Sequence, residues 1–566
     1  MTEGNGSFPG LFFSQVARYQ DRVALRHKDY GIWKRISWKE YGETVRIVAA
    51  GLISLGVKRG DKISILGENR PEWLFCDLGN MSIGGVSVGV YPTSAPDQIA
   101  YVVGHSESKV LFIENEEQVD KVLQILPELQ VKEVIVWDTK GLWGFSKERI
   151  IFFDEFLQRS RAYLEQNPDC VDRRLAEIQP DDTAMIIYTS GTTGRPKGAM
   201  ISHNNILSMT ESYIQANPGF ETDEALSYLP LAHIYENLIS LFQAIRTGGT
   251  VNFVESMDTL PHNLKEVSPT IFASVPRIWE KFASMIAIRM ADSTPSKKLL
   301  YKISIGVGLK YVRTSPNSRE RFWWSLLYWP LYGLVLYHLK KQLGLERVRV
   351  AICGAAPASP ELFQYYNAIG VPLREGYGQT ESTGVIAVQR LERPRWGYVG
   401  EVVPGVEVRI AEDGEILARG ANVFKGYFKN PELTAETVKD GWLYTGDVGA
   451  LEDGFLKIMD RKKDIIITAG GKNITPAFIE NKLKFSSYIQ DAVVIGEGRK
   501  FLSALILIDE DNVTKYAQDK RIPFTTFEDL TQNPEIRQLI DQEVVNVNKT
   551  LSQVESIKKF ALLPRR

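Results

Sequence analysis

Short apolar runs alternate with longer amphipathic segments over the first third of the chain. Residues 62–66, 84–92 and 110–113 are rich in aliphatic side chains and are flanked by turn-forming or charged residues, which predicts buried strands. Residues 38–55 repeat apolar positions at the helical period and predict a helix. Strands that alternate with helices are typical of βα layers on mostly parallel sheets, so the pattern predicts an α/β fold.

A glycine-rich loop comes after another apolar run. Residues 184–188 predict a buried strand, and residues 202–207 predict the start of a helix beyond the loop. The loop itself combines glycines with hydroxyl side chains and a lysine: Ser190, Gly191, Thr192, Thr193, Gly194 and Lys197. Glycines let the backbone approach a ligand closely, and the donors and the lysine suit phosphate groups. The loop lacks the Walker A spacing, and a flexible surface loop is the alternative.

A second strand that leads into a loop is predicted at residues 347–353, ahead of Gly354-Ala-Ala-Pro357. Ligands of open α/β sheets bind at the carboxyl ends of strands, so the strand ends after Tyr188, Cys353 and Arg374 are expected to line one cleft. The alternative is that Gly354 only makes a tight turn.

The charge pattern changes near residue 460. The run Asp460-Arg-Lys-Lys-Asp464 separates two strand-like segments, residues 455–459 and 465–467, and this position indicates a hinge. A solvated surface is the alternative for such a charge run. A hairpin loop is predicted at residues 470–473, and the rest of the chain has a βαββα pattern. We therefore predict a large domain over residues 1–460, a hinge at 461–463 and a small domain over 464–566.

Length and composition narrow the possible classes. A chain of 566 residues is too long for one hydrophobic core, and its 44% apolar and 24% charged residues are ordinary for a globular protein. The net charge of −2 gives no reason to expect a nucleic-acid partner. Three widely spaced cysteines indicate neither a metal site nor a disulfide framework and suit the cytoplasm. No signal peptide is predicted, and the oligomeric state is left open.

Four motifs, in order, resemble those of the adenylate-forming (AMP-binding) superfamily. The glycine-rich loop is similar to its phosphate loop, residues 376–381 (Gly-Tyr-Gly-Gln-Thr-Glu) to its adenine and magnesium motif, and residues 444–447 (Tyr-Thr-Gly-Asp) to its ribose motif. Residues 460–464 resemble its interdomain hinge. The resemblance runs from about Tyr19 to the C-terminus. The segments 229–236, 274–281, 440–449 and 454–463 are similar to the long-chain fatty acyl-CoA synthetase branch.

The resemblance implies a function. Such an enzyme activates a long-chain fatty acid with ATP and Mg²⁺ to acyl-AMP and transfers the acyl group to CoA. It also implies a large domain of stacked mixed and parallel sheets and a small, mobile C-terminal α+β domain. Transfer to a carrier protein, or non-catalytic binding of a nucleotide or acyl-AMP, are the alternatives.

The resemblance also implies roles for individual residues. Residues 189–197 would hold the β- and γ-phosphates, Tyr377 would stack on adenine, Thr380 would bond the α-phosphate, and Asp447 would accept both ribose hydroxyls. Lys463 would be the pivot of the small domain, and His233 would lie near the acyl carboxylate. The complete predicted site comprises catalytic Lys197, Thr189, Glu381, His233 and Lys463; ATP-binding Thr189, Ser190, Gly191, Thr192, Thr193, Gly194, Lys197, Gly354, Ala355, Ala356, Glu375, Gly376, Tyr377, Gly378, Thr380, Asp447 and Arg461; and the Mg²⁺ ligands Glu381 and Thr189.

The sequence departs from the family at its end. Members usually carry a lysine in a glycine-containing loop near the C-terminus, where it neutralises the carboxylate and the α-phosphate. The chain reaches Arg566 before such a loop, and Lys558 and Lys559 lack that context. A shortened chain is the simplest expectation, and the non-catalytic alternative depends on this point.

Residues 322–338 form the most apolar and aromatic segment. As a helix its 17 residues would span about 25 Å, less than the roughly 30 Å of a bilayer core, and Pro330 is expected to break it, so no membrane span is predicted. Nine lysines and arginines but one acid, Glu320, lie between Lys297 and Lys341. This combination suits peripheral docking on an anionic membrane through residues 297–341, and helices packed on the large domain are the alternative.

Overall fold

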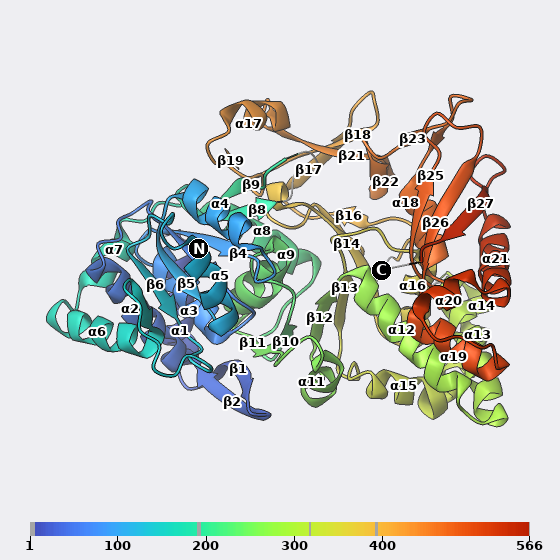
Figure 1. Cartoon of the computed structure of the whole chain (residues 1–566), viewed down its shortest axis with the longest axis horizontal. Helices are drawn as coiled ribbons and strands as arrows, with labels where there is room; N and C mark the ends of the chain where they lie inside the picture. The colour runs from blue at the N-terminus through green and yellow to red at the C-terminus, as the bar shows by residue number, and fades with distance from the viewer. Residues whose placement is uncertain (1–5, 190–193, 316–317, 391–393, 565–566) are drawn as a thin grey trace.

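The computed structural model describes residues 6–189, 194–315, 318–390 and 394–564. Two large sheets with helices between and around them form the N-terminal part, and a smaller unit of strands and helices comes after it (Figure 1). This architecture confirms the predicted α/β class, with a large N-terminal domain and a smaller C-terminal one.

The first sheet contains most of the strands predicted from apolar runs. Among the described residues it has eight strands, of which β3 to β8 are parallel, while β9 and β19 extend one edge in the antiparallel direction. Burial on both faces explains why these strands read as continuous apolar runs. In spatial order they are β19 (Gly426–Tyr427), β9 (Lys197–Ser202), β8 (Thr183–Thr189), β4 (Val86–Val90), β3 (Lys62–Leu66), β5 (Ser108–Ile113), β6 (Glu133–Val136) and β7 (Ile150–Phe152).

The second sheet joins a parallel half to an antiparallel half. Strands β1 and β10 to β14 are parallel, whereas β15 to β22 pair in the antiparallel direction where they belong to this sheet. Its order is β17 (Val406–Ile410), β18 (Glu415–Gly420), β21 (Trp442–Glu452), β22 (Phe455–Arg461), β16 (Gly400–Val402), β15 (Ala387–Val388), β14 (Leu373–Tyr377), β13 (Val350–Cys353), β12 (Ile271–Ser274), β10 (Glu224–Ser227), β11 (Thr250–Phe253), β1 (Val23–Asp29) and β2 (Ile32–Ser37), with β20 (Val438–Lys439) beside β21.

Helices cover both sheets and fill the space between them. The largest buried cluster joins residues of both sheets with Phe8 and Phe12 of α1, Trp38 of α2 and Phe242 of η1. The helices of the large domain are α1 (Phe8–Tyr19), α2 (Trp38–Ser54), α3 (Pro71–Met81), α4 (Pro96–Ser106), α5 (Glu116–Ile125), α6 (Phe153–Gln166), α7 (Cys170–Ala176), α8 (His203–Ala216), α9 (Ile234–Glu236), the π-helix η1 (Asn237–Gln243), α10 (Ala244–Thr247), α11 (Leu260–Val267), α12 (Pro276–Ala291), α13 (Pro295–Arg313), α14 (Arg319–Leu331), the π-helix η2 (Tyr332–Leu336), α15 (Tyr337–Gln342), α16 (Pro360–Ala368), the 3-10 helix η3 (Thr380–Ser382) and α17 (Pro431–Thr437).

The glycine-rich loop leads into a strand and not directly into the predicted helix. Strand β9 begins at Lys197 and pairs with β8 in the antiparallel direction. Helix α8 begins only after β9, where the Ser202 side chain accepts a hydrogen bond from the Asn205 amide. The helix start was predicted correctly, but the antiparallel strand between loop and helix was missed because residues 197–202 are too short and mixed to show a period.

The small unit has its own sheet and core. Strands β25 (Ile489–Ile495), β26 (Leu502–Ile508) and β27 (Ile557–Leu562) form its sheet, and β23 (Ile466–Ile467) pairs with β24 (Asn473–Ile474) around the predicted hairpin loop. Its helices are α18 (Pro476–Lys484), α19 (Glu510–Lys520), α20 (Phe527–Gln532) and α21 (Pro534–Asn548). An ion pair of 2.8 Å joins Lys515 Nζ to Asp292 Oδ1 beyond α12, so the unit is docked on the helical face of the large domain.

Pro330 does not break the aromatic segment. It lies inside α14, and the chain continues through η2 into α15. A π-helix relocates the hydrogen bonds that a proline disrupts, so the predicted break is wrong and the segment is one helical rod. No helix among the described residues is long and apolar enough to cross a membrane.

A buried carboxyl group makes the stability of the large domain depend on pH. Asp77 is only 3% exposed, and burial raises its pKa from 3.8 to about 7. Because the folded pKa lies above the unfolded one, this group favours folding below about pH 4, and that contribution is lost as pH rises toward 7. We expect Asp77→Asn to raise the melting temperature relative to wild type more at pH 8 than at pH 4.5. An equal shift at both pH values would contradict this assignment.

Candidate active site

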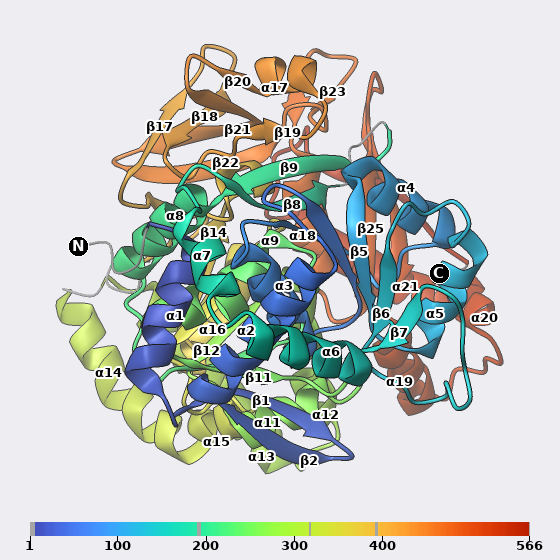
Figure 2. The same ribbon diagram turned by 90° about the vertical axis from the view of Figure 1, so that its left-hand side faces the viewer.

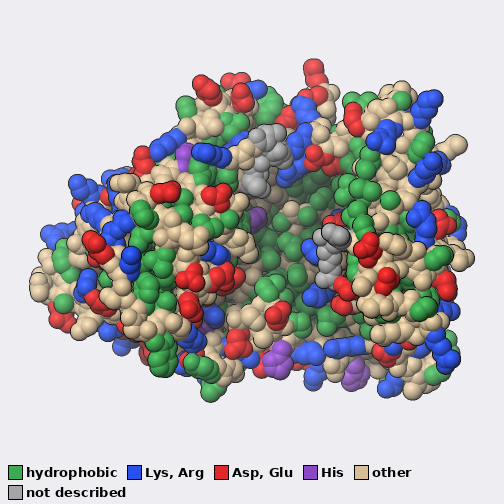
Figure 3. Space-filling view, in the orientation of Figure 1, with side chains coloured by type: hydrophobic (Ala, Val, Ile, Leu, Met, Phe, Trp, Pro, Cys, Tyr) green, Lys and Arg blue, Asp and Glu red, His purple; other side chains and the backbone are tan. Residues whose placement is uncertain are grey.

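The surface is hollowed between the two sides of the molecule, and apolar side chains line the hollow (Figure 3). A cavity of ≈ 810 Å³ lies where the carboxyl ends of β8, β13 and β14 face the β21–β22 hairpin and the residues after it. Thr189, Gly354 and Gly378, at or just beyond these three strand ends, all line it. The prediction of a single cleft is therefore confirmed, although β8 belongs to the other sheet.

The phosphate-loop hairpin contributes two lining side chains. Thr189 ends β8, Lys197 begins β9, and the two residues are paired across the hairpin. The Tyr101 hydroxyl donates to the Pro196 carbonyl at 3.1 Å, and this contact ties the loop to α4. The predicted residues Ser190, Gly191, Thr192 and Thr193 lie outside the described residues, and Gly194 is not among the lining residues.

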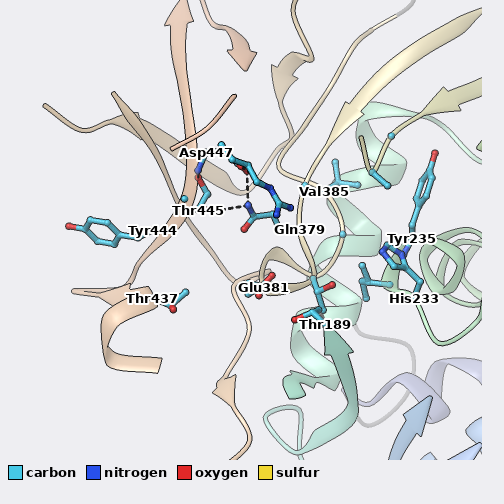
Figure 4. Close-up of a pocket in the computed structure, with 18 of the residues that line it drawn as sticks. Thr189, His233, Tyr235, Gln379, Glu381, Val385, Thr437, Tyr444, Thr445 and Asp447 are labelled. Carbon is cyan, nitrogen blue, oxygen red and sulfur yellow. Dashed lines mark hydrogen bonds and ion pairs between the residues drawn. The ribbon is translucent and has the colours of Figure 1, made fainter. Parts of the chain in front are cut away.

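Glu381 lies in the middle of the cavity with Thr189 (Figure 4). The Tyr427 hydroxyl donates to Glu381 Oε1 at 2.6 Å, and the Lys197 ammonium lies 5.7 Å from the centre of the Tyr427 ring. Burial, together with the adjacent carboxylate, raises the pKa of Tyr427, so the phenol remains a neutral donor. Tyr427 thus contacts the Glu381 carboxylate through its hydroxyl and Lys197 through its ring.

The sequence did not identify Tyr427 as a site residue. It reaches the site because β19 pairs with β9, placing Tyr427 opposite Ala199. The only local signal is the preceding Gly426, whose φ of +127° favours glycine and whose missing Cβ leaves room for the Thr434 side chain. A glycine beside an aromatic residue is too common to identify such a residue without the sheet pairing.

Asp447 lies at the end of the cavity opposite His233 (Figure 4). Its Oδ2 accepts hydrogen bonds from the Tyr377 hydroxyl and from Gln379 Nε2, both at 2.6 Å. Arg461 Nε lies 3.9 Å from Oδ1, because Asp447 and Arg461 are paired between β21 and β22. Burial raises the pKa of Asp447, and the Tyr377 hydrogen bond and Arg461 oppose this shift. These two hydrogen bonds occupy Oδ2, so Oδ1 can accept a hydrogen bond from a further donor.

The residues after β22 add positive charge to the wall. Arg461, Lys462 and Lys463 all line the cavity. Lys462 Nζ pairs with Asp413 at 2.6 Å and with Glu415 at 3.0 Å, whereas Lys463 enters none of the ion pairs between described residues. Lys463 therefore keeps its charge available to an anion in the cavity.

His233 marks the apolar end of the cavity, near Tyr235 and Val385 (Figure 4). Its Nδ1 accepts a hydrogen bond from the Tyr235 amide at 3.1 Å, and burial lowers its pKa. The neutral ring therefore carries its proton on Nε2, which is left as a donor. The neighbouring walls are apolar side chains: Ile234, Leu238, Ile352, Val385 and Val388.

A buried polar cluster fixes the segment that carries His233. Glu236 Oε1 accepts hydrogen bonds from Ser227 Oγ at 2.6 Å and from Ser240 Oγ at 2.5 Å. Asn69 Nδ2 lies 3.3 Å from the same oxygen, and Asn69 Oδ1 accepts from the Leu231 amide. Burial raises the pKa of Glu236 to about 7. This cluster links the two large sheets at the base of the segment.

Most predicted site residues that the structure describes lie together. The cavity is lined by Thr189, Lys197, His233, Gly354, Ala355, Gly376, Gly378, Thr380, Glu381, Asp447, Arg461 and Lys463. Ala356, Glu375 and Tyr377 are not among the lining residues, although each is next to one that is. Tyr377 contacts the site through its bond to Asp447, and its stacking on adenine stays a prediction. Gln379, a residue of the 376–381 motif for which no role is predicted, donates a hydrogen bond to Asp447.

Comparison with known proteins defines the class. The model of the AMP-binding enzyme family matches residues 12–428, and that of the AMP-binding enzyme C-terminal domain matches residues 463–564. The chain belongs to the AMP-binding enzyme family.

Curated relatives match nearly the whole chain. It is 34% identical over 549 residues to the long-chain-fatty-acid–CoA ligase FadD15 of Mycobacterium bovis, covering 96% of this chain and 89% of the relative. It is 32% identical over 588 residues to the long-chain-fatty-acid–CoA ligase ACSBG1 of Rattus norvegicus, covering 98% and 80%.

Solved structures agree on the fold. The anthranilate CoA ligase AuaEII in complex with anthranoyl-AMP superposes with a TM-score of 0.75 at 17% identity, covering 99% of this chain and 93% of that one. ATP-bound MatB from Rhodopseudomonas palustris gives a TM-score of 0.70 at 21% identity, covering 98% and 95%.

Proposed function

We propose that the protein is a long-chain fatty acid–CoA ligase that uses ATP to form acyl-AMP and then transfers the acyl group to CoA. One observation carries the proposal: a single cavity joins the phosphate-loop lysine and the Asp447 carboxylate to an apolar end beside His233. Such a cavity has places for a nucleotide and for a carboxylate with an apolar tail. The near full-length similarity to two long-chain-fatty-acid–CoA ligases supports the same function.

The charges of the cavity suit a reaction between two anions. A carboxylate oxygen attacks the α-phosphate, and pyrophosphate leaves. Lys197 and Lys463 line the cavity and form no ion pair with another described residue, so both can interact with a bound anion. Fixed positive charges of this kind stabilise the negative charge that develops in the transition state. We infer that His233 Nε2–H donates to the fatty acid carboxylate and that Asp447 Oδ1 accepts a hydrogen bond from the ribose.

We infer that Mg²⁺ acts with ATP at Glu381 and Thr189. The donor set fits: a carboxylate and a hydroxyl are hard oxygen ligands, and Mg²⁺ usually takes one or two carboxylates together with phosphate oxygens and water. The fit does not require a cage of protein ligands, and no group of three or more metal-binding side chains occurs among the described residues. When bound, the ion would neutralise phosphate charge.

We also propose that the protein acts in the cytoplasm.

We propose further that residues 461–463 are a hinge. Asp460 is buried at the end of β22, and its Oδ2 accepts a hydrogen bond from the Ala477 amide in α18 at 3.2 Å. The next three residues line the cavity and lead into the small domain, so a rotation there would exchange the groups that face the acyl-AMP.

The function is tested with two reactions analysed by mass spectrometry. The protein is incubated with ATP, Mg²⁺, CoA and saturated fatty acids of graded length, and separately with acyl-AMP and CoA. We expect acyl-CoA from long-chain acids in the first reaction and from acyl-AMP in the second. Acyl-AMP that accumulates without thioester would favour a carrier-protein acceptor. No product in either reaction would favour a binding protein and overturn the proposal.

A further inference from the structure

Helices α13 and α14, the π-helix η2 and the first residue of α15 expose several large apolar side chains. Between residues 299 and 337 the exposed members are Leu299, Leu300, Ile303, Phe322, Trp323, Leu326, Leu327, Trp329, Leu334 and Tyr337. Phe322 and Trp323 are each 60% exposed, and Leu334 is 69% exposed. Single exposed apolar residues are normal on a protein surface, but a cluster of this size marks an interaction site.

The apolar exposure has the helix period. On α14 the pairs Phe322–Trp323 and Leu326–Leu327 are four residues apart and share one face, which points to solvent. The inward positions are also apolar, since Tyr328 and Leu336 are buried. The rod is therefore apolar on both faces, whereas a helix that only packs on a domain turns polar residues outward.

The helices are firmly held, so the exposure does not come from loose packing. The Tyr311 ring of α13 stacks on Tyr328 of α14 with centroids 4.4 Å apart and planes at 9°. Gly308 lets α13 approach α16 closely, because a Cβ at this position would lie 2.9 Å from the Ala368 carbonyl oxygen. The Tyr301 and Tyr365 hydroxyls are hydrogen-bonded at 3.2 Å between the same two helices.

Positive charges accompany this apolar face. Lys297, Lys298, Lys302 and Lys310 are all exposed on α13, and none enters an ion pair with another described residue. Arg313 and Arg321 have internal roles instead: Arg313 Nε donates to Gln364, and Arg321 lies 4.1 Å above the Tyr311 ring. Arg319 at the start of α14 is also exposed and enters no ion pair with another described residue, so the four lysines and Arg319 are the cations available to a partner.

We propose that α13, α14 and η2 form a docking surface for an anionic lipid bilayer. Tryptophan and other apolar side chains flanked by lysines are the composition that binds at a membrane interface. A second copy of this chain is disfavoured, because a twofold contact would pair this face with itself, and residues 297–341 offer its lysines a single acid, Glu320. Figure 2 shows α14 at the periphery of the molecule, on the opposite side from α20 and α21, so the small domain does not block this approach.

The surface is separate from the active-site cavity, because none of residues 295–342 lines that cavity. Binding can therefore be measured without turnover, and the proposal does not depend on the proposed reaction. If the protein is a ligase, docking would bring the cavity to membrane-dissolved fatty acids.

The test is co-sedimentation with vesicles of phosphatidylcholine alone or with added phosphatidylserine, at 0.1 M and 1 M salt. We expect binding to the anionic vesicles at low salt and much weaker binding at high salt, since the screening length falls from about 10 Å to about 3 Å. Replacing Lys297, Lys298, Lys302 and Lys310 together by Gln should lower the partition coefficient by about a thousandfold at low salt, since each basic residue near an anionic surface contributes about 1 kcal/mol. The double variant Trp323→Gln and Leu326→Gln should also bind more weakly.

Trp143→Gln is the matched control, because Trp143 is 92% exposed and lies outside these helices. It should bind as wild type does. Melting temperatures are measured for all variants to verify folding. We expect them to match that of the wild type, because every changed side chain is exposed. Three results would overturn the proposal. They are no binding to anionic vesicles, binding whose strength depends on neither salt concentration nor lipid charge, and a dimer in solution that dissociates when Trp323 and Leu326 are replaced.

Discussion

Replacing Glu381 by Gln lowers the rate of acyl-CoA formation by about a hundredfold or more, on the scale of losing one electrostatic stabiliser. The variant keeps the size of the side chain and one acceptor oxygen but loses the negative charge proposed to bind Mg²⁺. The Tyr427 hydroxyl can still donate to the amide oxygen, so folding should be preserved. The measurement is initial rate against Mg²⁺ concentration, with the long-chain acid saturating.

Tyr427→Phe separates the position of the carboxylate from its charge. This change removes only the 2.6 Å hydrogen bond and leaves Glu381 ionised. We expect a higher Mg²⁺ requirement with a maximal rate that falls far less than in Glu381→Gln. Unchanged activity of Glu381→Gln at every Mg²⁺ concentration would show that the metal assignment is wrong.

Replacing Asp447 by Asn raises the KM for ATP by about tenfold to a hundredfold, since a hydrogen bond to a charged group contributes roughly 1.5–3 kcal/mol. The maximal rate should change less, because the ribose does not react. Tyr377 and Gln379 still have an oxygen to bond, so the local structure should remain. Asp453→Asn is the control, because this side chain is 85% exposed at the far end of the same hairpin.

ATP without ribose hydroxyls tests the contact directly. With 2′,3′-dideoxy-ATP the wild-type enzyme should lose affinity, and Asp447→Asn should lose little more, because the partner of the carboxylate is already absent. Equal losses for the wild type and for the variant would mean that Asp447 does not contact the ribose.

Much of the fold was predictable because its signals are local. The strands at 62–66, 110–113 and 184–188 are buried on both faces and therefore read as short apolar runs, and Ser202 begins α8 through a cap that involves its immediate neighbours. The predicted helix break at Pro330 was wrong, because a π-helix that begins two residues later changes the backbone hydrogen-bonding pattern and lets the helix continue. It also missed β9, which exists because β8 and β19 pair on either side of it.

The sequence by itself determined the chemical inventory: the hydroxyl and glycine loop, the carboxylates Glu381 and Asp447, and the cations around Lys463. Tertiary structure decided which of these groups face one another. The contact between Tyr427 and Glu381 spans 46 residues and depends on an edge strand of one sheet meeting the 3-10 helix η3 that follows β14 of the other. Tertiary structure also decided which face of α14 reaches solvent, because a helix apolar all round carries no pattern that distinguishes its buried side from its exposed one.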